Sequence, residues 1–329
     1  MPPTIMGCVM AFTGLHQAGL ALLSVAVFGL SAVPLELQRR IVNSLTARSG
    51  VETIFWLAVG YAGVALAEQL LKLTLNVYRG WVAESSVRRL RHRICAIAPG
   101  AHTASAQGTG MEIAMILDEA EPIGGFMGIS VSEPLLQGGI LVSVIGYMFV
   151  LQPQLALLGL AFFLPQTVFV PLLQRAINRR ARARILIKRG VSGAIAQGRR
   201  AEVAQRTRGG IQRIFALNMG IYRLKYSLNL AMNLMHHLSV AVALCLGGWM
   251  ALQGRIEVGT VVAIVGGLGK LNDPWGDLVN WGREFSVVTV KYRLFAEAVE
   301  WLGEPSEALR AANWRRDSGT GRRRLPPTT

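Results

Sequence analysis

Long apolar runs alternate with polar segments along the chain, and the runs have the length of membrane-spanning helices. A transmembrane helix needs roughly 20 predominantly apolar residues, and residues 14–35 and about 53–78 each supply one span. Residues 134–174 contain no Lys, Arg, Asp or Glu. At about 1.5 Å per residue, this run is long enough to cross a hydrocarbon core of about 30 Å twice.

Turn signals complete the set of spans. Gln152-Pro153-Gln154 is expected to form the turn between the third and fourth spans. Residues 226–254 hold a fifth span, and a sixth, more polar span begins at residue 258. The pattern therefore predicts an all-α membrane protein with six transmembrane helices.

The polar segments between the spans differ greatly in length. Residues 79–97 and 174–226 are rich in Arg and Ala and predict helices that continue the spans well past the bilayer. We expect these helices to break at residues 99–110 and again around Thr207-Arg208-Gly209-Gly210, where Gly and Pro interrupt the pattern. The result is two long helical hairpins on one side of the membrane and short connections on the other.

Composition and charge support this arrangement. The chain has 329 residues, of which 52% are hydrophobic and only 16% are charged, whereas soluble domains carry about 25% charged residues. Of the 34 Lys and Arg residues, 28 fall on the side of the termini and the long hairpins and four on the other side. The positive-inside rule places that side in the cytoplasm, and we expect the plasma (inner) membrane. The net charge of +15 is then explained without a nucleic-acid partner.

Few residues indicate a chemical site. The three cysteines are scattered, which predicts neither a metal nor a redox site, and His236-His237 lack a further clustered ligand. Residues 266–271 (GGLGKL) approach the phosphate-binding pattern GxxxxGK[ST] but lack its first Gly and its hydroxyl. We interpret these glycines as positions of close helix packing. No catalytic or cofactor-binding residue is predicted in this chain.

Several short motifs occur in a characteristic order. They are Pro34 with residues 35–42; Thr109-Gly110-Met111-Glu112-Ile113 with Asp118-Glu119; residues 210–216 (GIQRIFA); residues 254–262 (GRIEVGTVV); Asn272-Asp273-Pro274-Trp275; and residues 292–295 with 301–305. In this order and spacing the chain resembles the transmembrane domain of ATP-binding-cassette (ABC) exporters over roughly residues 14–306. The resemblance implies an N-terminal segment (1–13), a six-helix exporter-type domain (14–300), and a linker remnant with a basic tail (301–329).

The resemblance also implies partners. It implies a second six-helix subunit, identical or different, and nucleotide-binding domains that would supply ATP and Mg²⁺ from outside this chain. Segments that would contact those domains are Thr109, Gly110, Met111, Glu112 and Ile113 in the first hairpin, and Thr207, Arg208, Gly209, Gly210 and Ile211 in the second. Membrane lipid is the remaining expected partner.

Charges in the sixth span are the best candidates for a translocation path. Lys270, Asp273 and Asp277 have the spacing of one helix face, Glu284 continues it, and Trp275 and Trp281 lie nearby. Charged residues at membrane depth usually face a water-filled cavity or a partner. Lys270 could instead simply pair with Asp273. Glu68 and Lys72, four residues apart, are expected to form a structural ion pair.

Two other functions remain open from the sequence. The chain could be a truncated or accessory membrane protein that does not transport, or an ATP-independent secondary carrier. A carrier has no need of the long helical hairpins, and this feature favours the exporter subunit. An ATPase supplied by another chain and loss by truncation are about equally compatible with the sequence.

Overall fold

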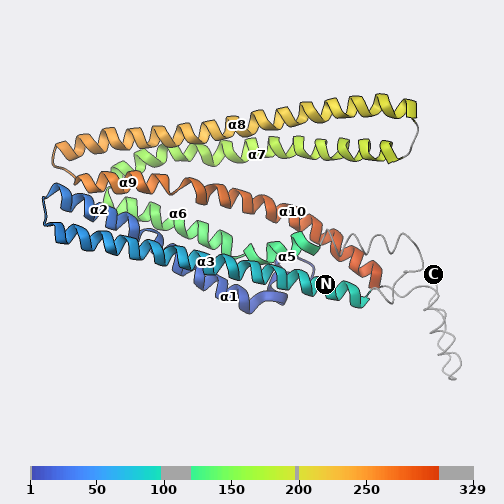
Figure 1. Ribbon diagram of the computed structural model, residues 1–329, viewed down its shortest axis with the longest axis horizontal. Helices are drawn as coiled ribbons and strands as arrows, with labels where there is room; N and C mark the ends of the chain where they lie inside the picture. Colours follow the sequence, from blue (N-terminus) through green and yellow to red (C-terminus); the bar gives the residue numbers. More distant parts are fainter. Residues whose placement is uncertain (1, 98–119, 197–199, 304–329) are drawn as a thin grey trace, which may run out of the picture. The chain divides into compact units, whose positions relative to one another are not determined.

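The computed structural model describes residues 2–97, 120–196 and 200–303, and every regular element in these ranges is an α-helix (Figure 1). The helices are α1 (Ile5–Ser31), α2 (Val33–Thr46), α3 (Val51–Ile97), α5 (Ala120–Ile129), α6 (Ser132–Leu151), α7 (Pro153–Ala196), α8 (Arg200–Leu252), α9 (Val258–Gly269) and α10 (Asn272–Gly303).

Five helical stretches in the described part of the chain are long and apolar enough to cross a membrane. They are Ile5–Thr46, Val51–Ala96, Ala120–Leu151, Pro153–Arg184 and Arg208–Leu252. They contain the first five predicted spans, and the turn predicted around Pro153 separates α6 from α7. The sixth predicted span corresponds to α9 and the start of α10. The all-α membrane fold is therefore confirmed.

The helical continuations of the spans are also present. Helix α3 runs on to Ile97, α7 reaches Ala196, and α8 begins at Arg200. The break predicted around Gly209 is wrong, because residues 207–210 lie inside α8. A mid-helix glycine costs only about 1 kcal/mol relative to Ala, and the helix formers on either side, together with packing against α7, outweigh this cost. The break predicted at residues 99–110 lies outside the described residues.

By its contacts the chain divides into two compact units. The first contains Met1–Ser31, Val64–Ile140 and Pro274–Thr329, and the second contains Ala32–Gly63 and Leu141–Asp273. Helices α3, α6 and α10 contribute residues to both units.

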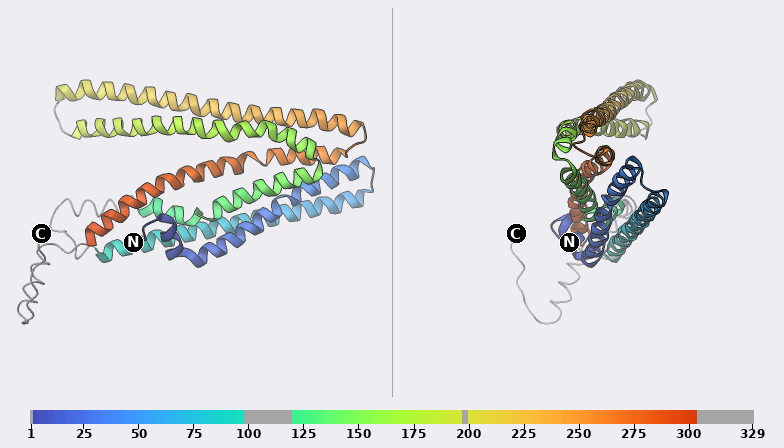
Figure 2. Two further views of the ribbon diagram at one scale, coloured as in Figure 1. Left: turned by 180° about the vertical axis from the view of Figure 1, so that it is seen from behind. Right: turned by 90° about the vertical axis from the view of Figure 1, so that its left-hand side faces the viewer.

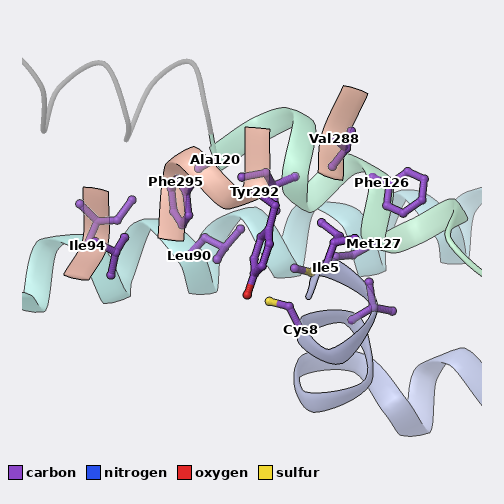
Figure 3. Packing of buried hydrophobic residues seen from close by; sticks show 13 residues of the cluster. Ile5, Cys8, Leu90, Ile94, Ala120, Phe126, Met127, Val288, Tyr292 and Phe295 are labelled. Carbon is purple, nitrogen blue, oxygen red and sulfur yellow. The ribbon is translucent and has the colours of Figure 1, made fainter. Parts of the chain in front are cut away.

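The first unit has an apolar core built from four helices. Side chains of α1, α3, α5 and α10 converge in it (Figure 3) and include Cys8, Leu90, Phe126, Tyr292 and Phe295, all at most 2% exposed. Full burial of a large apolar side chain contributes about 1.5–3 kcal/mol relative to exposure. The hydroxyl of Tyr292 donates to the carbonyl of Pro2 at 2.7 Å. This core holds the start of α1 against α10.

The second unit contains the long pair α7 and α8, which lie side by side in each of the views (Figures 1 and 2). Their polar ends are tied together by hydrogen bonds. Arg180 donates to the carbonyl of Gly220 at 3.4 Å, and Arg184 donates to Asn218 Oδ1 at 3.1 Å. In the same unit, α2 packs against α9.

Candidate translocation site

The sixth apolar element is interrupted in its middle. Helix α9 ends at Gly269, Lys270 and Leu271 form a turn, and α10 begins at Asn272. The N–H of Lys270 donates to the carbonyls of Gly266 and Gly267. Pro274 lies in the first turn of α10, where its missing N–H is tolerated, but it cannot continue the hydrogen bonding of α9.

This break corrects the predicted polar face. Lys270 lies in the turn and is half-buried, so it does not share a continuous helix with the carboxylates that follow. Asp273, Asp277 and Glu284 do share one face of α10, and all three are exposed. Trp275 lies between them in sequence and is partly buried.

Within the first unit, Asp277 belongs to a polar network that crosses three helices. Gln137 of α6 donates from Nε2 to Asp277 Oδ2 at 3.0 Å and to Glu133 Oε1 at 2.9 Å. Glu133 forms an ion pair with Arg79 of α3, with 2.5 Å between Nη1 and Oε2. Arg79 Nε also donates to Ser132 Oγ at 2.8 Å. The exposed carboxylate of Asp277 is thus linked to a charge pair inside the bundle.

The ion pair at the centre of this network is largely buried. The Arg79 side chain is 10% exposed and the Glu133 side chain 16%. Removing charges from water is costly, and a buried pair persists only when its geometry and additional hydrogen bonds compensate. Ser132 and Gln137 supply such bonds. The network therefore fixes the orientation of polar groups where α3, α6 and α10 meet, next to the ends of the predicted spans.

Aromatic side chains flank the same part of α10. Trp281 stacks on Phe285 with ring centroids 5.7 Å apart and on Phe126 of α5 at 6.4 Å. These contacts hold α10 against α5 at positions that follow Asp277 along the helix.

A second polar cluster joins α2 to neighbouring helices in the second unit. Glu36 accepts hydrogen bonds from Arg39, from Arg40 and from the Tyr147 hydroxyl, the last at 2.7 Å. Arg39 also pairs with Glu257 at 2.9 Å, just before α9.

Asn43 connects the same two elements. Its side chain donates to Glu257, and its Oδ1 accepts from the N–H of Gly259 at 2.8 Å. This bond satisfies one of the N–H groups left open at the start of α9. Gly259 is required at this point, because a Cβ there would lie well under 3.0 Å from the Arg39 carbonyl oxygen.

Two predictions about individual residues are confirmed. Lys72 and Glu68 form an ion pair, with 2.7 Å between Nζ and Oε1. The GGLGKL stretch lies in α9 and the turn after it, and a Cβ at Gly267 would lie 2.8 Å from Met148 Sδ. Gly266 and Gly267 therefore allow close helix packing, whereas a Cβ at Gly269 would meet no atom of the described residues within 4 Å.

The residues expected to contact nucleotide-binding domains are placed only in part. Thr109, Gly110, Met111, Glu112 and Ile113 lie outside the described residues. Thr207, Arg208, Gly209, Gly210 and Ile211 belong to α8, near its first residue, Arg200. Arg208, Gly209 and Ile211 are exposed.

Sequence reasoning missed the pair of Arg79 and Glu133. Each borders an apolar run and thus counts as the first charge beyond a span. Ser132, the residue before Glu133, is 53 positions from Arg79, so no local spacing predicts that Arg79 and Glu133 meet. The available signal is that Glu133 directly adjoins the long uncharged run 134–174, where an unpaired charge is costly.

Helices of membrane-crossing length, with paired charges buried between them, define an integral, multi-pass, all-α membrane protein. The family model for the ABC transporter transmembrane region matches residues 18–219, and the chain therefore belongs to this family. Comparison with curated proteins finds no match.

Family membership settles part of what the sequence predicted. The chain has the exporter-type all-α fold and is a membrane subunit of a transporter. The matched region ends inside α8. The motifs expected beyond it, including those of α9 and α10, stay predictions.

Proposed function

We propose that this chain forms the translocation path of an ABC exporter. In this proposal, ATP hydrolysis in nucleotide-binding domains outside these 329 residues drives a change in the membrane helices. ATP and Mg²⁺ belong to those domains. The exposed carboxylates Asp273 and Asp277, with Lys270 and Trp275, are proposed to line the path.

The length of α7 and α8 carries this proposal. The two helices have 44 and 53 residues, which correspond to about 66 Å and 80 Å at about 1.5 Å per residue. A hydrocarbon core is about 30 Å thick. About half of each helix therefore extends beyond the membrane, as a rigid pair tied by Arg180 and Arg184. Such a pair can transmit force from a domain outside the bilayer to the spans.

The contact with the nucleotide-binding domains is proposed at two places. One is Thr109–Ile113 and the other is Thr207–Ile211, near the start of α8. Nucleotide-driven association of those domains would shift the population of helix arrangements in the membrane.

An exposed apolar stripe on α8 supports a second six-helix subunit. Ile211, Phe215, Met219, Tyr222 and Tyr226 recur every three or four residues on one face, and each is at least 38% exposed. The first four precede the uncharged run, which starts at Tyr226 itself, so the stripe lies largely beyond the part of α8 that lipid would cover. Exposed apolar patches of this kind mark interaction surfaces. We infer that the stripe packs against a partner subunit.

The distribution of basic residues supports the orientation. With 28 of the 34 basic residues on one side, we propose that both termini lie in the cytoplasm, together with the end of α7 at Ala196 and the start of α8 at Arg200. We propose that the host membrane is the plasma (inner) membrane.

Site-specific cross-linking in native membranes tests this function. A photo-reactive residue at Arg208 is expected to cross-link to a domain that binds ATP, identified by mass spectrometry of the product. The matched control places the same group at Leu238, in the apolar part of the same helix, and should yield no such product. Absence of an ATP-binding product from position 208 and from position 111 would favour an accessory protein or a carrier.

A further inference from the structure

A basic pocket lies between α1 and α3 in the first unit. Its volume is about 430 Å³, and its lining consists of Pro2, Ala11, Phe12, Arg89, His92 and Arg93. One wall is apolar and comes from the N-terminal part of the chain. The other wall comes from three basic or titratable side chains on α3, all of them exposed.

Contacts with Phe12 hold two arginines at this pocket. Arg89 Nη1 donates to the Phe12 carbonyl, and the guanidinium of Arg93 lies 4.4 Å from the centroid of the Phe12 ring. A guanidinium has five N–H donors, and the bond to Phe12 uses one of those on Arg89. The two cationic groups are therefore fixed next to each other, and within the described ranges of the chain most of their donors remain available.

The local charge is strongly positive. From Arg88 to Arg93, α3 carries four arginines and His92, and no acid follows before the helix ends at Ile97. Helix α1 contains no charged residue. An anionic ligand is favoured at such a site, and the planar fork of Arg fits the oxygens of a phosphate.

The position of the pocket along the helices indicates the source of that phosphate. His16 donates or accepts a hydrogen bond with the Tyr78 hydroxyl at 2.9 Å, and its ring lies 5.1 Å from that of Trp81. Such amphipathic rings gather at the membrane–water boundary. Phe12 lies one turn further out on α1, a rise of about 6 Å. The pocket is therefore at the depth of lipid headgroups, which form a layer of about 5–8 Å on each side.

We propose that this pocket binds the headgroup phosphate of an anionic phospholipid. Arg89 and Arg93 bind the phosphate oxygens, and the upper part of an acyl chain lies along Ala11 and Phe12. Basic pockets between transmembrane helices are typical sites for anionic headgroups. Bound lipid links α1 to α3, and this site requires neither ATP nor the proposed exporter activity.

Lipid titration of the purified full chain in neutral detergent tests the site. Thermal unfolding is followed while phosphatidylglycerol, phosphatidylcholine or inorganic phosphate is added, and native mass spectrometry counts retained lipid. Phosphatidylglycerol should raise the unfolding temperature and remain bound, and phosphatidylcholine should not. Stabilisation by inorganic phosphate at equal concentration would show a free-anion site and overturn the lipid assignment.

Substitutions localise the effect. Arg89→Gln and Arg93→Gln should each weaken the response to phosphatidylglycerol roughly tenfold, because each removes charge-assisted hydrogen bonds to phosphate. Arg88→Gln is the matched control: it removes the same charge from the same helix, but Arg88 does not line the pocket. Equal weakening by Arg88→Gln, or equal retention of both lipids by the unsubstituted chain, would refute the proposal. The retention of phosphatidylglycerol over phosphatidylcholine by the unsubstituted chain decides even if a variant folds poorly.

Discussion

Replacing Gly259 with Ala tests the packing of α9 against α2. The added Cβ would lie well under 3.0 Å from the carbonyl oxygen of Arg39 and from Oδ1 of Asn43. Carbon atoms pack at about 3.5–4.0 Å, so relief requires a separation of about 1 Å. Because the Arg39 oxygen belongs to the backbone of α2, side-chain rotation alone cannot provide it.

The expected cost follows from three terms. Overpacking typically costs about 1–3 kcal/mol. Displacing Asn43 from the N–H of Gly259 costs about 1 kcal/mol, as loss of a helix cap does. Ala in place of Gly returns at most about 1 kcal/mol. The net expectation is a destabilisation of about 1–3 kcal/mol.

Thermal unfolding in detergent micelles measures this change. A loss of about 1–3 kcal/mol corresponds to a decrease of about 2–12 °C in the unfolding temperature of a large domain. Gly269→Ala is the control in the same helix, since an added Cβ there meets no atom within 4 Å, and the unfolding temperature should stay level or rise slightly. Equal decreases in both variants would refute the close contact between α9 and α2.

Three further substitutions probe the polar networks. Arg79→Gln leaves the buried Glu133 without its cation and should cost about 3–5 kcal/mol, while the double variant with Glu133→Gln should recover much of the lost unfolding temperature. Tyr147→Phe removes the hydrogen bond to Glu36 and should lower stability by about 1 kcal/mol in the same assay, with no effect pointing to a bond that is not formed. Asp277→Asn retains an oxygen for the bond from Gln137, so the unfolding temperature should change little. Because Asp277 is proposed to line the path, ATP-driven export into membrane vesicles should fall in this variant. Unchanged export would show that Asp277 does not line the path.

The apolar runs predict the spans well because the membrane imposes their length. The first five predicted spans lie within helices of crossing length, and the turn at Pro153 is where the sequence places it. Helix ends are less well predicted. The first helix begins at Ile5, before the predicted start at residue 14, because residues 5–12 are themselves apolar and Cys8 and Val9 pack in the core.

Two predictions about helix breaks are wrong, in opposite directions, at segments that contain glycine or proline. Gly209 and Gly210 predict a break, but α8 continues through them because its packing against α7 exceeds the small propensity cost. At Lys270 the helical spacing predicts a continuous face, but the glycines before it and Pro274 after it end α9 and start α10. Periodicity alone cannot distinguish these two cases.

Contacts between distant segments account for what the sequence could not predict. The Glu68–Lys72 pair is local, so its spacing predicts it. The pairs of Arg79 with Glu133 and of Arg39 with Glu257 join helices far apart in sequence, and only the fold brings them together.

Cryo-electron microscopy of the assembly extracted from its native membrane shows whether a nucleotide-binding partner contacts the long helices. We expect an ATP-binding domain in contact with the cytoplasmic ends of α7 and α8, at or near Thr207–Ile211, and a second six-helix subunit against the stripe from Ile211 to Tyr226. Helix ends that contact only lipid or solvent, with no nucleotide-binding partner, would contradict this expectation.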